Sequence, residues 1–201
     1  MSSASAKDGV FINCPFDLGY RPIFDAIVFT ICVCGFRARS ALEVIDSGEL
    51  RLTKIMRLIK DCRFSIHDLS RVELDAENDL PRFNMPIELG IAMGLKEYSR
   101  RAHTLLILDS ERFRYQKFAS DLAGLDIAAH GNIVERAIPR VRNFLAVAQS
   151  ALPTGDVIVE FYRQFELALP ALSAAAKQSV AELTFSDRAR HIDNFIAFAG
   201  T

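Results

Sequence analysis

The sequence contains no tryptophan, only four cysteines, and only ten glycines and seven prolines among 201 residues. So little glycine and proline excludes a collagen-like or low-complexity chain. Half of the residues are hydrophobic (50%) and about a quarter are charged (24%), which excludes a disordered chain. The length and composition therefore predict one large globular domain, or one domain with a small appendage.

An excess of positive charge is also absent, because 24 basic side chains face 25 acidic ones and the formal net charge is −1. Proteins whose main partner is nucleic acid usually carry a basic excess. We therefore do not expect nucleic acid to be the partner of this protein.

Long apolar runs are missing as well. Residues 1–8 are polar and lack the apolar segment of a signal peptide, and the apolar run 28–34 is far shorter than the ~20 residues that span a bilayer. The cysteines form no CxxC pair and no Cys/His cluster with zinc spacing, so we expect buried thiols in a reducing compartment and no metal site. These features predict a cytoplasmic protein without a membrane partner.

Several familiar catalytic and cofactor motifs do not occur. There is no GxGxxG and no GxxxxGK[ST], so a classical dinucleotide fold or a P-loop NTPase is not supported. There is no GxSxG and no HExxH, which excludes the common hydrolase elbow and zinc-protease signatures. We therefore expect no bound cofactor.

What is present is an alternation of short apolar runs with amphipathic segments. The predicted strands cover residues 10–12, 36–44, 63–67, 104–108 and 126–129. The predicted helices between them cover residues 20–33, 50–59, 84–96 and 133–150. This alternation is typical of an α/β domain with right-handed crossovers. We predict a flavodoxin-like three-layer sandwich with a mainly parallel sheet of about five strands.

The C-terminal part of the chain is helical. After a break at residues 153–155, we expect helices at residues 156–169, 171–183 and 186–199. The predicted organisation is a disordered tail (1–8), an α/β domain (9–150) and a helical extension packed on it (151–201). The phenylalanines of this extension either pack on the core or form an interface between copies; they are Phe161, Phe165, Phe185, Phe195 and Phe198.

Polar side chains follow the predicted strands, where ligands bind in open α/β sheets. After the first strand come Asn13, Pro15, Phe16 and Asp17, and after the third come Asp68, Ser70 and Arg71. The next helix is preceded by Arg82 and opens with Asn84, which we expect to be its N-cap, and Glu88. These residues are the candidate site.

Glu88 is the central candidate. A carboxylate in the first turn of a helix is stabilised by the helix dipole, and this alone is sufficient to explain it. The alternative is catalysis, since Asn84 lies on the same face one turn earlier and carboxylates stabilise oxocarbenium-like transition states at sugars. Gly90 and Gly94 together cost the helix roughly 2 kcal/mol relative to alanine, which suggests a close approach by the sheet or a ligand.

The other charged candidates also have two interpretations, one structural and one functional. Asp68 either caps a turn or orients ribose hydroxyls. Arg71 or Arg82 would suit a phosphate, because guanidinium groups bind planar anions bidentately. The helix at 50–59 carries a cationic face that is either solvated or able to bind phosphate, formed by Arg51, Lys54, Arg57 and Lys60.

Three segments carry a resemblance to a known family. They are Val10-Phe11-Ile12-Asn13-Cys14-Pro15, Ile66-His67-Asp68-Leu69-Ser70 and Asn84-Met85-Pro86-Ile87-Glu88-Leu89-Gly90-Ile91-Ala92-Met93-Gly94. Together they resemble the nucleoside 2-deoxyribosyltransferase family and its TIR-like relatives. The segment from Leu80 to Gly90 also resembles uncharacterised bacterial TIR-like proteins linked to defence against phage.

The resemblance implies a role for each matching residue. Glu88 would attack or stabilise the anomeric carbon, Asp68 would orient the sugar, and Asn84 would contact ribose or phosphate. The loop from Asn13 to Asp17 would line the base or sugar pocket. The implied function is an N-glycosidase that cleaves the ribose–base bond of NAD, a nucleoside or a nucleotide without a metal, with NAD as a substrate rather than a cofactor.

One alternative is a non-catalytic TIR-like module that senses a nucleotide or assembles with partners. Under either function, the expected partner is a small nucleotide or nucleoside, and we expect a homo-oligomer.

Overall fold

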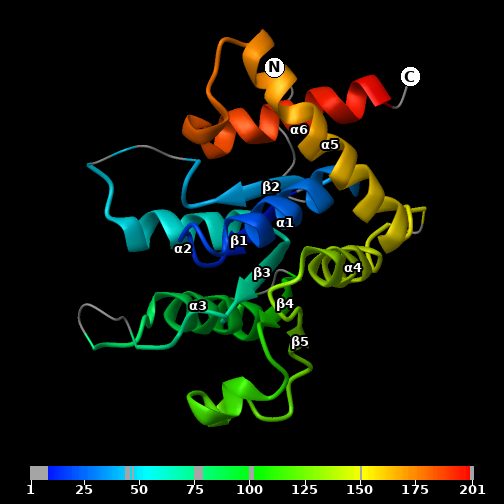
Figure 1. Ribbon diagram of the computed structural model, residues 1–201. Helices are drawn as coiled ribbons and strands as arrows, with labels where there is room; N and C mark the ends of the chain where they lie inside the picture. The colour runs from blue at the N-terminus through cyan, green and yellow to red at the C-terminus, as the bar shows by residue number, and fades with distance from the viewer. Residues whose placement is uncertain are drawn as a thin grey trace.

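The fold is described from a computed structural model (Figure 1). It describes residues 9–43, 46, 48–74, 79–99, 102–149 and 151–199. The tail predicted at residues 1–8 lies outside the described residues.

A five-stranded sheet forms the centre of the fold, and all its strand pairs are parallel. The strands lie in the order β2-β1-β3-β4-β5. Their bounds are β1 Gly9–Asn13, β2 Arg37–Ser40, β3 Phe64–Asp68, β4 Thr104–Asp109 and β5 Ala128–Ala129. The predicted fold class, a flavodoxin-like sandwich with a parallel sheet, is confirmed.

Strand β2 is shorter than the strand predicted at residues 36–44. It is the edge strand and pairs only with β1, whose Ile12 lies opposite Ser40. Because β1 ends one residue later, β2 has no further partner and the chain turns away after Ser40. The last predicted residue, Val44, lies outside the described residues.

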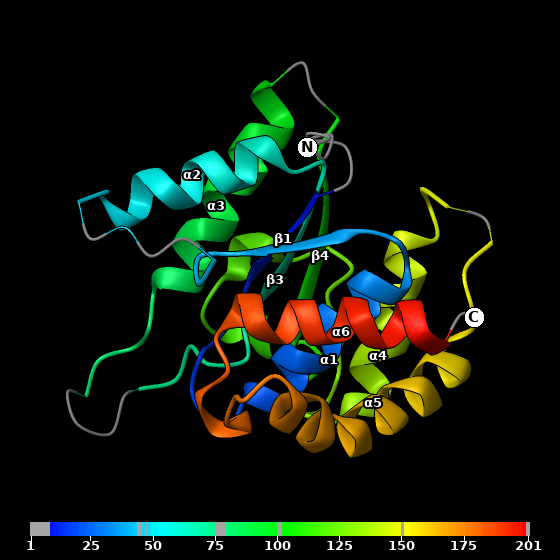
Figure 2. The ribbon, with the colours of Figure 1, turned by 90° about the horizontal axis from the view of Figure 1, so that it is seen from above.

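Helices cover both faces of the sheet (Figure 2). Strand β1 shows the two faces, because Val10 and Ile12 belong to one apolar cluster and Phe11, between them, to another. Helices α1 (Arg21–Val33) and α4 (Val134–Leu145) pack on the first side. Helices α2 (Arg51–Asp61) and α3 (Asn84–Tyr98) pack on the second.

The C-terminal helices form a further layer over α1 and α4. Helix α5 runs unbroken over Gly155–Ala175 and α6 over Phe185–Ala199, so the separate helices predicted at 156–169 and 171–183 are wrong. The buried positions of α5 keep helical spacing on both sides of Pro170: Ile158, Val159, Tyr162, Phe165, Leu169 and Ser173. Packing of this stripe on the core outweighs the helix-breaking tendency of the proline.

Shorter elements complete the described chain. The loop between β4 and β5 contains two 3₁₀ helices, η2 (Arg114–Lys117) and η3 (Ser120–Leu122), and a third, η4 (Val180–Glu182), lies between α5 and α6. No helix in the described part of the chain is long and apolar enough to cross a membrane.

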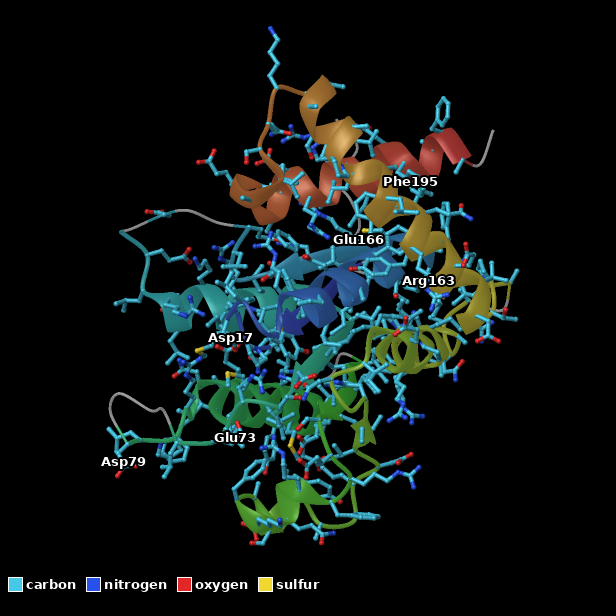
Figure 3. The ribbon with its side chains drawn as sticks, in the orientation of Figure 1. Asp17, Glu73, Asp79, Arg163, Glu166 and Phe195 are labelled. Carbon is cyan, nitrogen blue, oxygen red and sulfur yellow. The ribbon has the colours of Figure 1, made fainter. Side chains whose placement is uncertain are left out.

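The phenylalanines of the C-terminal helices pack mostly inward. Phe165 is fully buried and stacks on Phe29 of α1, with ring centroids 5.3 Å apart. Phe195, labelled in Figure 3, packs against Phe165 and Phe161. Phe198 is the exception at 84% exposed. Packing on the core, the first of the two predicted alternatives, therefore accounts for most of this aromatic set.

The start of α5 is tightly packed on α4. A Cβ atom added at Gly155 would lie 2.9 Å from the Cβ and Cγ atoms of Pro139. We therefore expect Gly155→Ala to lower the free energy of unfolding by about 1–3 kcal/mol, because the helices must move apart. Urea denaturation measures this loss.

The control for this prediction is Val157→Ala, in the same turn of α5 at an exposed position. It should change the free energy of unfolding by about 0.5 kcal/mol or less. Equal stability of the Gly155→Ala variant and the wild type would show that the contact between α4 and α5 is looser than described.

Candidate functional site

A cavity of about 380 Å³ opens where β1 ends and α2 and α3 begin. It brings together most of the predicted site residues, namely Asn13, Pro15, Phe16, Asp17, Arg82, Asn84 and Glu88. The other residues that line it are Cys14, Arg51 and Met85. In Figure 3, Asp17 lies between the ribbons of α2 and α3. The cavity lies where ligands bind in this class of fold.

Glu88 is the most buried acidic side chain of this cavity. It is only 7% exposed, and burial raises the pKa of its carboxyl to about 7, while the charge of Arg51 acts in the opposite direction. Both the protonated and the ionised forms are therefore populated near neutral pH. A carboxyl group with such a pKa suits proton transfer or nucleophilic chemistry.

Asn84 does not cap α3 as predicted. The N-cap is Phe83, no side chain caps the helix, and Asn84 is the first helical residue. Its exposed side chain lines the cavity instead. Because this side chain makes no capping hydrogen bond to the helix backbone, its amide is able to contact a ligand in the cavity.

The surroundings of the two glycines of α3 also differ from the prediction. An atom added at the Cβ position of Gly90 or Gly94 would meet nothing within 4 Å. The predicted close approach of the sheet to these glycines is therefore wrong, and neither glycine is among the residues that line the cavity. Both glycines lie on the side of α3 that faces away from the sheet.

Asn13 fastens the end of β1 to the start of α3. Its side-chain amide donates to the carbonyl oxygen of Met85 at 2.9 Å and to Nδ1 of His67 at 3.0 Å. Burial lowers the pKa of His67 to about 3, so this imidazole is neutral and accepts at Nδ1. Asn13 is 3% exposed, and it therefore shapes the floor of the cavity.

Asp68 does not line the cavity, contrary to its predicted role at the sugar. It is fully buried, and its carboxylate accepts hydrogen bonds from the hydroxyl of Tyr20 (2.7 Å), the backbone N–H of Ser70 (2.8 Å) and Nε2 of His130 (2.9 Å). Burial alone would raise the pKa of Asp68, but the bonds and charge from His130, with those from Ser70 and Tyr20, hold it below its usual value. Asp68 therefore holds three chain segments together.

Ser70 and Arg71 are also absent from the cavity lining. Ser70 is buried, and its hydroxyl lies 3.1 Å from Nε2 of His130. Arg71 pairs with Asp17, with its Nε 3.6 Å from Oδ2. Of the two arginines predicted to hold a phosphate, Arg82 lines the cavity. Arg71 does not line it and contacts the cavity residue Asp17 instead.

Arg51 is the one residue of the cationic face of α2 that lines the cavity. Arg57 of the same face pairs with Glu49, with Nη2 2.8 Å from Oε2, and Lys54 is buried. As the first residue of α2, Arg51 stands beside a helix N-terminus, which favours anions. Arg51 and Arg82 together give the cavity two positive charges next to Glu88.

A second cavity, of about 440 Å³, shares Pro15, Phe16 and Asp17 with the first. Its other walls come from α1, the turn after β2 and the start of α6, and they include Phe24, Leu42 and Phe185. The second cavity is lined by both apolar and charged side chains, and the charged ones include Arg21, Asp25 and Arg188. The loop from Pro15 to Asp17, called the partition loop below, separates the two cavities.

Comparison with known proteins adds no assignment to this geometry. No protein-family model matches the chain, and no curated protein matches it. The resemblance to nucleoside 2-deoxyribosyltransferases and TIR-like proteins therefore stays a prediction from the three short segments. Within the described residues, no group of three or more histidine, cysteine, aspartate or glutamate side chains is arranged to hold a metal ion.

Proposed function

We propose that this protein is an N-glycosidase that cleaves the bond between ribose and a base in NAD, a nucleoside or a nucleotide. The observation that carries the proposal is Glu88, a nearly buried carboxyl group in a cavity that also presents the amide of Asn84 and the guanidinium groups of Arg51 and Arg82. A carboxylate, an amide and two cations are the groups that a phosphorylated sugar needs.

The proposed reaction takes place at the anomeric carbon. The bond from this carbon to the base nitrogen breaks, and its electron pair leaves with the base. The ionised carboxylate of Glu88 either forms a bond to the carbon or stabilises its oxocarbenium character. Water or an acceptor hydroxyl then supplies the oxygen that completes the product and releases a proton.

The two cavities suggest where the parts of the substrate lie. The sugar must reach Glu88, so the sugar and any phosphate lie in the first cavity, with Arg51 and Arg82 on the phosphate. The base then lies toward the partition loop, where Phe16 borders both cavities. The aromatic ring of Phe16 at this border favours a planar heterocycle.

The nature of the leaving group favours NAD among the substrates. Its nicotinamide leaves as a neutral molecule and needs no proton, whereas most other bases leave more easily when protonated. Among the described residues that line the first cavity, Asp17 is the only carboxylate besides Glu88, and it is paired with Arg71. A substrate that requires no general acid therefore suits this cavity best.

The direct test is to incubate the purified protein with NAD and with panels of nucleosides and 5′-nucleotides, and to measure free base by chromatography. Release of a base would establish the glycosidase and identify its substrate. If the folded protein binds a nucleotide but releases no base, the alternative of a nucleotide-sensing module is favoured. The observation that supports this alternative is that Asp68, the residue predicted to orient the sugar, is fully buried and does not line the cavity.

The pH dependence of base release is a further prediction. Glu88 must be ionised to act on the anomeric carbon, and its pKa is about 7, so kcat/KM should rise with pH through about 7 and then level off. Arg51→Gln removes the charge that lowers this pKa. The midpoint of the profile should therefore move to higher pH, which pH–rate measurements on both proteins would reveal.

The matched control is Arg57→Gln on the same helix, since Arg57 pairs with Glu49 and does not line the cavity. Its profile should keep the wild-type midpoint. A downward shift in Arg51→Gln, or equal shifts in both variants, would contradict the role given to Arg51.

A further inference from the structure

The outward side of α3 carries large apolar side chains that nothing in the described chain covers. Phe83, Ile87 and Tyr98 are 61%, 54% and 89% exposed. Together with Gly90 and Gly94 they follow one another at intervals of three or four residues, so all five lie on one face of the helix. This face is called the α3 stripe below.

Helix α2 widens the apolar surface beside the stripe. Leu52 and Met56 are each 50% exposed, and helical spacing places them on the same side of α2 as Ile59. Ile59 belongs to the apolar cluster against which Ile91 and Leu95 of α3 pack. Because α2 packs beside α3, the exposed pair adds apolar surface next to the helix that carries the stripe.

No packing contact in the described part of the chain requires glycine at the two positions of the stripe. Two glycines in a helix interior cost roughly 2 kcal/mol relative to alanine. Neither Gly90 nor Gly94 has an atom within 4 Å of its Cβ position, so neither glycine is required by packing inside the described chain. A flat glycine surface between large apolar side chains does allow another helix to approach closely.

We propose that the stripe is the interface of a homodimer in which the α3 helices of two copies cross antiparallel about a two-fold axis. The spacing of the stripe is self-complementary in this arrangement. A two-fold axis midway between residues 88 and 89 places Phe83 opposite Gly94 of the partner subunit, and Ile87 opposite Gly90 of the partner subunit. Each large side chain then faces a glycine, as an isologous interface requires.

The exposed apolar area of the α3 stripe and the neighbouring side chains of α2 is large enough for a dimer interface. Five side chains that are each at least half exposed offer apolar surface on the order of 500 Å². A standard interface buries about 800 Å² on each partner, of which about 57% is apolar. The stripe and its neighbours on α2 therefore supply the apolar part of one such interface. This dimer is independent of the proposed glycosidase activity.

The test combines single substitutions with a swap. Sedimentation equilibrium of the full chain should show a dimer. Gly94→Phe places two phenylalanines opposite each other and should raise the dimer dissociation constant about 30-fold or more. Phe83→Gly removes the large side chain and should also weaken the dimer. Because Phe83 is the N-cap of α3 and glycine is tolerated there, this variant should still fold.

The decisive protein is the double variant Phe83→Gly/Gly94→Phe, which restores one large side chain opposite one glycine in the same register. It should recover most of the dimer affinity. Phe198→Gly, at an exposed position of α6, is the control and should dimerise like the wild type. Thermal unfolding of each variant checks that it is folded.

Three outcomes would overturn the proposal. They are a wild-type chain that stays monomeric at high micromolar concentration, a dimer that persists unchanged in Gly94→Phe, and a double variant that is as weak as the single variants while folded.

Discussion

Replacing Glu88 with glutamine is expected to lower kcat/KM for base release by about 1,000-fold or more. Glutamine keeps the size of the side chain but cannot carry the negative charge that the anomeric carbon requires. The substrate should still bind, because Arg51, Arg82 and Asn84 remain in the cavity. The measurement is the rate of base release over a range of substrate concentrations, with chromatography of the free base.

The control for this variant is Glu97→Gln, on an exposed position of the same helix. It should retain the wild-type rate. If Glu88→Gln kept its activity within tenfold of the wild type, the carboxylate would have no catalytic role. If Glu97→Gln lost activity as well, the loss would come from α3 and not from the chemistry of Glu88.

Replacing Asp68 with alanine is expected to lower the free energy of unfolding by about 3–5 kcal/mol. The carboxylate of Asp68 accepts hydrogen bonds from Tyr20, Ser70 and His130 in a fully buried position. Alanine would leave these donors without their acceptor and would open a small cavity between α1, the end of β3 and the loop after β5. Urea denaturation at neutral pH measures the loss.

The free energy of unfolding at acid pH provides a second measure of the contribution of Asp68 to stability. The pKa of Asp68 is held below its usual value in the folded protein. Its stabilising contribution is therefore present above the pKa of the unfolded chain and is lost as the pH falls through the folded pKa. The difference in unfolding free energy between wild type and Asp68→Ala should accordingly shrink in acid.

The control is Asp126→Ala, at an exposed position. It should change the free energy of unfolding by about 0.5 kcal/mol or less. Equal stability of Asp68→Ala and Asp126→Ala would refute the structural role of Asp68. It would also reopen the role that the sequence suggested for Asp68 at the sugar.

Much of the fold could be predicted because its signals are local. The apolar run of β4, the helical spacing of α1 and the amphipathic pattern of α2 each lie within one short segment. Predictions failed where packing decided the outcome. The sequence predicts separate helices at 156–169 and 171–183, but the buried stripe of α5 continues through Pro170. Strand β2 ends close to the end of its partner strand.

In the candidate site, too, some residues could be found from a local sequence pattern and others could not. Asn84 and the residues from Asn13 to Asp17 lie at element ends, and Glu88 lies one turn into α3, beyond the first turn in which it was predicted. A sequence pattern was sufficient to find all of them. Arg51 was only one of four cations on a helix, and the pattern gave no reason to prefer it. His130 and Tyr20 were missed altogether, since they meet Asp68 from positions 62 and 48 residues away along the chain.

The sequence by itself determined the α/β class, the parallel sheet and the edge of that sheet at which polar side chains gather, because these depend on short-range periodicity and on strand ends. Only the tertiary structure decided that Glu88 lines a cavity while Asp68 is fully buried outside its lining, and that Gly90 and Gly94 face outward. Burial, pKa and exposure depend on what distant segments bring to each residue. A residue's own neighbours in the sequence do not contain that information.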